Sequence, residues 1–251
     1  TLATSTAEVG FPRFADFIFV FSYEPECGID LPSIQSEVLG QLDLRFQPEL
    51  CFTSGALHVH VNSSFFAREE IEAIADETIG SGKFLASHAV TRDGIIYSLN
   101  AGARTIEHGF AMDDECMDLM VKKNAYWCPT ATVIDFVAEG RAKAGNPINA
   151  QMLRALPATF KKALQKGVKI AFGTDAGGFD WHKMPQAREF SFYVQWGMTP
   201  MQAIKSATTV AAELLNKKGL LGEISKGSMA DIIAVDGDPL QDIKVLEKIS
   251  F

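Results

Sequence analysis

The sequence contains no long apolar run, few cysteines and no lysine before Lys83. A membrane helix needs roughly 18 to 20 consecutive apolar residues, whereas the apolar run over 14–21 is short and contains Asp16. The four cysteines form no Cys-x-x-Cys pair, so neither a zinc ribbon nor a redox motif is supported. We therefore expect a chain without a membrane span whose cysteines are free thiols.

The sequence also lacks a basic surplus and the short motifs of several enzyme classes. Its formal net charge of -8 argues against nucleic acid or an anionic membrane as a partner, because both require a basic surface. It contains no Gly-x-Ser-x-Gly elbow and no Gly-x-Gly-x-x-Gly loop. With 251 residues, of which 47% are hydrophobic, it is long enough to bury a sizeable core.

Three short apolar runs each end in a residue type that binds metals. They lead to His88, to His108 and to Asp175. Each run is typical of a buried strand, and in a barrel of parallel strands the carboxyl ends converge on one face. The three side chains are therefore candidate ligands of one ion.

Each of these residues also has a simpler interpretation. A single histidine after an apolar run is more often a hydrogen-bonded structural residue, and Asp175 in Gly-Thr-Asp-Ala-Gly could be a turn former. Their common position, after a strand pattern and before a helix pattern, favours the joint metal site.

Strand and helix patterns alternate from about residue 66, which predicts a parallel α/β sheet. Gly102, Gly167 and Gly219 are helix stops, and Thr199-Pro200 is a helix start. The expected elements are helix 68–79, strand 83–90, helix 92–101, strand 104–108, helix 112–123, strand 126–132, helix 148–166, strand 168–174 and a helix from 200 to about 218. Beyond them, 222–236 has the short strands and turns of a β-rich appendage.

Five motifs in this order resemble the amidohydrolase superfamily, in the imidazolonepropionase-like branch that includes enzymes of the Xaa-Pro dipeptidase and ochratoxin amidase types. The resemblance covers about residues 66–251. The motifs are Ser87-His88-Ala89, Ile106-Glu107-His108-Gly109, Phe172 to Gly177, Gly197-Met198-Thr199-Pro200 with Ala203-Ile204 and Ala207-Thr208, and Gly227 to Ala234 with Gly237-Asp238-Pro239.

The resemblance implies a (β/α) barrel and a metal-dependent hydrolase of amide, peptide or other non-ester C–N bonds. His88 and His108 would be metal ligands, Asp175 a ligand and general base, and His182 a residue beside the substrate; a surface loop histidine is the alternative for His182. Zinc is the default cation, although cobalt, manganese or iron suits the same donors. The partner would be a small amide or dipeptide.

The sequence departs from the family pattern before position 66. The family carries a bridging lysine on its fourth strand, where Leu50 stands here. It also carries a His-x-His pair on its first strand. His58 and His60 supply such a pair, but they directly precede the segment that resembles the helix after the fourth strand. We therefore keep both interpretations of His58 and His60, as metal ligands or as exposed residues.

These departures predict an incomplete or rearranged TIM barrel in three parts. Residues 1–64 form an unassigned segment, 65–219 a barrel portion, and 220–251 part of a β-sandwich appendage. Two functions stay open: the hydrolase, or a catalytically impaired fragment or binding protein on the same scaffold. Substrate identity, oligomeric state and compartment stay open too. A cytoplasmic location is the default, and because the chain begins at Thr1 an exported form or a truncated sequence is the alternative.

Overall fold

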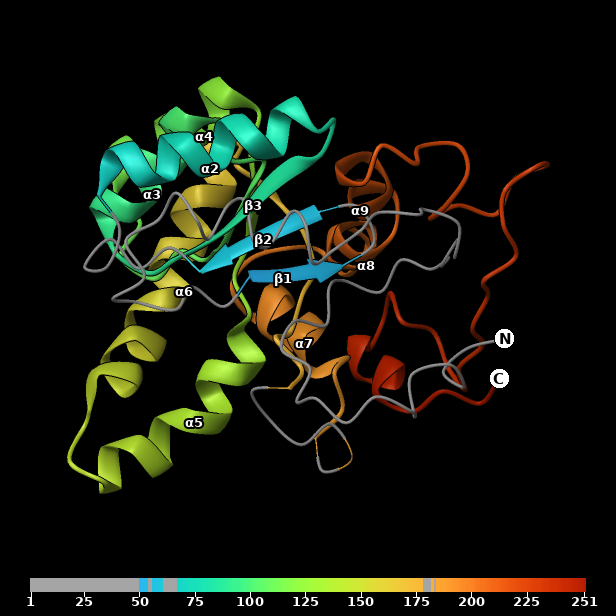
Figure 1. Cartoon of the computed structure of the whole chain (residues 1–251). Helices are drawn as coiled ribbons and strands as arrows, with labels where there is room; N and C mark the ends of the chain where they lie inside the picture. Colours follow the sequence, from blue (N-terminus) through green and yellow to red (C-terminus); the bar gives the residue numbers. More distant parts are fainter. Residues whose placement is uncertain (1–49, 54–55, 61–66, 178–181, 183) are drawn as a thin grey trace.

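The computed structural model describes residues 50–53, 56–60, 67–177, 182 and 184–251, and Figure 1 shows their arrangement. The elements alternate between strands and helices along most of the chain. They are β1 (Leu50–Thr53), β2 (Ala56–His60), α2 (Arg68–Gly80), β3 (Phe84–Ala89), α3 (Arg92–Ala101), β4 (Thr105–His108), α4 (Asp114–Lys123), β5 (Tyr126–Cys128), α5 (Ala131–Lys143), α6 (Ile148–Lys166), β6 (Lys169–Ile170), α7 (Arg188–Gln195), α8 (Pro200–Ala207), α9 (Thr209–Leu214) and the 3-10 helix η1 (Ile243–Glu247).

The strands form one sheet in sequence order, from β1 to β6. All neighbours from β2 to β6 are parallel, and β1 alone pairs antiparallel, with β2. Parallel neighbours joined by helices are the repeating unit of a (β/α) barrel. The predicted fold class, α/β with an incomplete or rearranged barrel, is therefore confirmed, and β1 is the rearranged strand.

Local capping explains why several helices begin and end where the sequence predicts. Thr91 accepts a hydrogen bond from the Gly94 amide at the start of α3, and Gly102 ends that helix in the left-handed conformation at φ 104°. Asp113 accepts from the Cys116 amide at the start of α4. Such caps satisfy backbone groups that the helix leaves without partners, so they fix its bounds from local sequence.

The two faces of the sheet have different chemistry. Leu85, Ile106 and Trp127, all buried completely, pack toward the helices in the main hydrophobic core. Because side chains alternate along a strand, the intervening His88 and Glu107 lie on the opposite, inner face. Because the apolar side chains are buried against the helices, the alternate residues of each strand point to the inner face.

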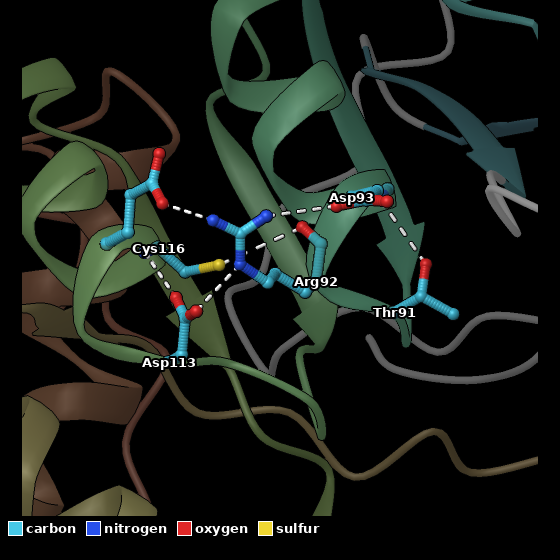
Figure 2. Close-up of polar contacts among 7 residues, drawn as sticks. Thr91, Arg92, Asp93, Asp113 and Cys116 are labelled. Atoms are coloured by element: carbon cyan, nitrogen blue, oxygen red, sulfur yellow. Dashed lines mark hydrogen bonds and ion pairs between the residues drawn. The ribbon is translucent and has the colours of Figure 1, made fainter.

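A cluster of ion pairs joins the helices on the outer side (Figure 2). Arg92, the first residue of α3, donates to Asp113 over 2.7 Å and to Asp93 over 3.0 Å, and it also pairs with Glu115. The Cys116 amide and Arg92 together lower the pKa of Asp113 to about 2. The cluster links the N-terminal ends of α3 and α4, and its exposure limits what it adds to stability.

The structure differs from the expected elements at two strand ends, at two additional helices and in the division of one helix. Residues 129–132 and 171–174 are not strand, since β5 and β6 end earlier, and helices α5 and α7 form where none was expected. The helix expected from 200 to about 218 is divided at Thr208, with φ -122° and ψ -95°. There the Ser206 carbonyl accepts from the Phe172 amide, so a contact with the segment after β6 replaces a helical hydrogen bond.

The C-terminal segment 220–251 leaves the helices after α9 and returns to them at η1, which packs against α7 and accepts from Ser191 through Glu247 over 3.3 Å. Of the short strands expected there it forms the bridge between Val235 and Ile249, beside hydrogen bonds between Ala234 and Phe251. The division of the chain into three parts stays a prediction, although β2 already pairs with β3 and β1 pairs with β2. Among the described helices, none is long and apolar enough to cross a membrane.

Candidate functional site

Two of the predicted ligands meet at the carboxyl ends of adjacent strands. His88 is the fifth residue of β3 and His108 the last residue of β4, and their ring centroids are 4.3 Å apart at an interplanar angle of 67°. His108 is 7% exposed, and His88 is half-buried. The fold therefore brings together two imidazoles that are 20 positions apart in sequence.

The hydrogen bonds around His108 determine its tautomer. Its Nδ1 lies 2.6 Å from the Thr130 hydroxyl, which itself donates to the Pro129 carbonyl over 2.7 Å. When the Thr130 hydroxyl donates its proton to the Pro129 carbonyl, it accepts from His108, which assigns the imidazole proton to Nδ1. Nε2 then keeps its lone pair, which is the arrangement of a metal-ligating histidine held by an outer hydrogen bond.

Backbone strain gathers at the same ends of the strands. His108, Thr130 and Asp175 have φ values of 66°, 52° and 55°, a left-handed region that residues other than glycine seldom adopt and that Asn, Asp and His adopt more readily than other side chains. The conformation is least favourable for Thr130, because its Cβ is branched. Strain of this kind persists where surrounding contacts enforce it, and it is frequent at functional sites.

Trp127 is one of the contacts that enforce this geometry. Its indole N–H donates to the His108 carbonyl over 2.9 Å, and the ring is completely buried. Gly109 follows at φ 60°, and a Cβ there would lie 2.7 Å from the Trp127 Nε1 atom. Because residue 109 is a glycine, the indole can approach closely enough to donate to the His108 carbonyl.

A carboxyl and a thiol line the inner face behind the histidines. Glu107 stands opposite His88 in the β3–β4 register and opposite Cys128 in the β4–β5 register. Burial, with a smaller contribution from the nearby charge of Asp175, raises the pKa of Glu107 to about 7. Burial also raises the pKa of the Cys128 thiol well above its usual value. Asp175 thus acts electrostatically on the inner face of both strands.

The remaining predicted residues are placed less completely. His58 and His60 lie on β2, and the backbone register pairs His60 with His88 and His58 with Ala86. Their side chains lie outside the described part of the chain. His182 is exposed in the loop after β6. Their predicted roles, metal binding for His58 and His60 and substrate contact for His182, stay predictions.

The donor chemistry of the site fits a divalent cation through the histidine pair. Within the described ranges, no group of three or more His, Cys, Asp or Glu side chains is arranged to hold an ion. The pair itself has the required features, since two imidazoles adjoin and His108 is held in the ligating tautomer. Further donors would have to come from Asp175 or from β2.

Sequence reasoning missed two buried residues beside the site. Thr130 stood in a stretch that was expected to be strand, and the helix that carries Glu189 was not expected at all. The Pro129-Thr130 pair directly after a buried strand was the available signal for Thr130, because parallel strands end in functional loops. No local signal identified Glu189.

Comparison with known proteins gives consistent results. Residues 53–250 match the amidohydrolase family. The chain is 33% identical over 195 residues to ochratoxinase from Aspergillus niger, a match that covers 74% of this chain and 39% of the relative. A Xaa-Pro dipeptidase crystallised with methionine in its active site is 41% identical, with a TM-score of 0.68 over 73% of this chain and 46% of that one. A prolidase in complex with N-methylphosphonate-L-proline is 33% identical, with a TM-score of 0.66 over 73% and 45%.

The matches cover only part of each relative. The match covers less than half the length of each of these three relatives. The matched part includes β3 to β6 and the strand ends that carry His88, His108 and Asp175. The resemblance that the sequence motifs indicated is thereby confirmed.

Proposed function

The chain belongs to the amidohydrolase family, and from this premise we propose that it contributes to metal-dependent hydrolysis of an amide or peptide C–N bond in a small molecule. The observation that carries the proposal is the histidine pair. Two imidazoles lie at the carboxyl ends of adjacent parallel strands, 4.3 Å apart between ring centroids, and a buried threonine hydroxyl lies 2.6 Å from Nδ1 of one. This edge is where barrel enzymes place their chemistry.

In the proposed site His88 and His108 are nitrogen ligands and Asp175 is a further donor. A divalent cation, zinc by default, would polarise the scissile carbonyl and lower the pKa of a water molecule. His60, opposite His88 in the register, and His58 are additional candidate ligands. The Thr130 hydroxyl contacts the His108 ring at Nδ1. This hydrogen bond, in addition to the packing of the ring, sets the orientation of Nε2.

Asp175 is the proposed proton carrier. As general base it would take a proton from the attacking water, and as general acid it would return that proton to the leaving nitrogen. Its negative charge already raises the pKa of Glu107. Glu107 is buried and has a pKa of about 7, so we propose that it is partly protonated. The region behind the histidines then carries less negative charge than two fully ionised carboxylates would give it.

The proposed substrate class follows from the relatives. The names of the similar proteins refer to a Xaa-Pro dipeptidase, a prolidase and an ochratoxinase. Dipeptides with carboxyl-terminal proline and N-acylated amino acids are accordingly the first substrates to test. His182, exposed after β6, is the proposed residue beside the substrate.

The test measures metal content and hydrolysis on the same samples. The full chain is purified without chelator, and bound metal is quantified by plasma mass spectrometry in the parent and in the His88→Ala, His108→Ala double variant. Hydrolysis of Xaa-Pro dipeptides and N-acyl amino acids is followed after addition of Zn²⁺. We expect stoichiometric metal in the parent, its loss in the double variant, and hydrolysis that depends on the metal.

His182→Ala is the matched control, because it removes a histidine outside the proposed ligand set. It should retain the metal and raise KM. A parent chain without bound metal and without hydrolysis after metal addition would contradict the proposal.

The second candidate is a catalytically impaired fragment or a binding protein on this scaffold. One observation favours it: Leu50 stands where the fourth-strand lysine is expected. Metal binding without hydrolysis of any substrate in the panel would support this candidate.

A further inference from the structure

Helix α5 begins directly after Thr130, and its own residues leave its first turn without a cap. Thr130 occupies the cap position in the left-handed conformation, and its side chain makes no capping hydrogen bond. The first turn of α5 contains no acidic residue. The first amides of a helix lack internal partners and carry the positive end of its dipole, so they require an acceptor from elsewhere.

Glu189 supplies this acceptor from α7, 57 or 58 positions away in sequence. One carboxyl oxygen accepts from the Ala131 amide over 2.8 Å, and the other accepts from the Thr132 amide over 2.7 Å and from the Thr132 hydroxyl over 2.6 Å. Glu189 and Thr132 are completely buried. A buried carboxyl with three donors is a specific structural feature, because burial without them would be costly.

The residue that precedes these amides is the one that holds His108. Thr130 accepts from His108 Nδ1 over 2.6 Å while its backbone has a φ of 52°. A threonine does not adopt this conformation without support from its surroundings. By fixing the two amides that follow, Glu189 fixes the position from which the Thr130 hydroxyl reaches the imidazole.

We infer that Glu189 is a positioning residue, which acts through the start of α5 and Thr130 to hold His108 in its Nδ1–H tautomer. The inference rests on the proposed function in one respect: a fixed orientation of Nε2 is useful because His108 is a proposed metal ligand. The contacts themselves contain no metal, so the inference can be tested on the metal-free chain.

The test records the ¹⁵N chemical shifts of the histidine ring nitrogens in the full, metal-free chain. His108 is assigned by the loss of its signals in His108→Ala. The parent should show the Nδ1–H tautomer in excess. In Thr130→Val, which removes the hydroxyl and keeps the shape, the ratio of Nδ1–H to Nε2–H should fall about five-fold, the scale of one net hydrogen bond.

Glu189→Gln should shift the same ratio in the same direction. The glutamine keeps the size of the side chain, but its NH₂ group would face a backbone amide that also donates. In the double variant Thr130→Val, Glu189→Gln the shift should be no larger than in Thr130→Val alone. A shift equal to the sum of the two single variants would mean that Glu189 acts by another route, and would overturn the inference.

Asp135→Asn is the matched control. The Asp135 carboxylate pairs with Arg188 over 2.7 Å, which also joins α5 to α7, one residue away from Glu189. This variant should leave the His108 ratio unchanged. If it shifts the ratio as Glu189→Gln does, loosening of the helix contact is sufficient and the specific role of Glu189 is wrong.

Thr132→Val provides a milder variant if Glu189→Gln does not fold. It removes one of the three donors to the carboxyl and should give a smaller shift of the same sign. An unchanged ratio in the folded Thr132→Val and Glu189→Gln proteins would overturn the inference. Failure of the proposed function would be visible separately, as absence of bound metal in the parent chain.

Discussion

The two ends of the parallel strands use polar residues in opposite ways. At the amino ends Lys169 pairs with Glu213 over 2.6 Å, and Arg104 donates to the Glu213 carbonyl over 3.0 Å and to Asn216 over 2.7 Å. Lys169 lowers the pKa of Glu213. Lys169 has a carboxylate partner here, whereas Arg104 has two neutral oxygen acceptors for its Nη2 and its buried Nε has none within the described residues.

At the carboxyl ends, polar groups are buried and strained instead. His108 and Thr130 are left-handed and nearly inaccessible, whereas at the other end the left-handed residues are Asn124 and Asn216, which tolerate that conformation. Burial raises the pKa of Glu107 rather than lowering it. The amino ends are built for stability, and the carboxyl ends accept a cost in stability that a functional site explains.

The strongest way to break this comparison is removal of both imidazoles at the carboxyl ends. In His88→Ala, His108→Ala we expect metal affinity to fall by about 10⁴-fold, since ligands of protein zinc sites contribute roughly 3 kcal/mol each. Isothermal titration with Zn²⁺ checks this. An affinity within ten-fold of the parent would place the metal elsewhere.

The glycine after His108 tests whether the strained geometry is enforced. Gly109→Ala should lower the free energy of unfolding by about 2 to 4 kcal/mol, because the new Cβ meets Trp127 Nε1 at 2.7 Å on a left-handed backbone. Gly82→Ala is the control, with a φ of 73° and nothing within 4 Å, and isolates the backbone cost. Urea unfolding measures both, and equal losses would contradict the role of Trp127.

The buried carboxyl of Glu189, near the carboxyl ends of the strands, should make stability depend on pH. Its pKa rises from 4.5 to about 7 on folding, mainly through burial, so the folded state binds more protons than the unfolded state. Stability from this group is therefore fully present below pH 4.5 and is lost as the pH rises toward 7, by about 3 kcal/mol at most. In Glu189→Gln this part of the pH dependence should disappear from urea midpoints measured between pH 4.5 and 7.5. An unchanged pH slope would contradict the pKa shift.

Thr130→Val should weaken metal binding without unfolding the chain. Loss of an outer hydrogen bond to a ligating histidine typically costs about 10 to 100-fold in affinity. Zinc titration measures the loss, and circular dichroism should show an unchanged fold. Thr159→Val, an exposed site in α6, is the control for the change of residue type.

The smallest effect is expected at the amino ends of the strands. Lys169→Met removes a partly exposed ion pair with Glu213 and should cost about 0.2 to 1 kcal/mol. Metal affinity should not change. A loss of metal binding in this variant would remove the distinction between the two ends.

Local sequence was sufficient for elements whose limits depend on neighbouring residues. Helix α3 was expected over 92–101 and is found there, because Thr91 and Gly102 provide both caps within the helix's own sequence. The shortening of β6 and the division at Thr208 were not predictable in this way. Both depend on the Phe172 amide, which donates to the Ser206 carbonyl 34 positions later.

The site shows the same division. The sequence by itself indicated that His88 and His108 lie at the ends of two strands and that Asp175 follows a third, since apolar runs and the residues after them are local features. Only the tertiary structure decided that the two imidazoles adjoin, that the Thr130 hydroxyl contacts His108 Nδ1, and that Glu189 caps the helix after Thr130. These contacts join residues 20 to 58 positions apart, and packing of the helices against the sheet is what brings them within hydrogen-bond distance.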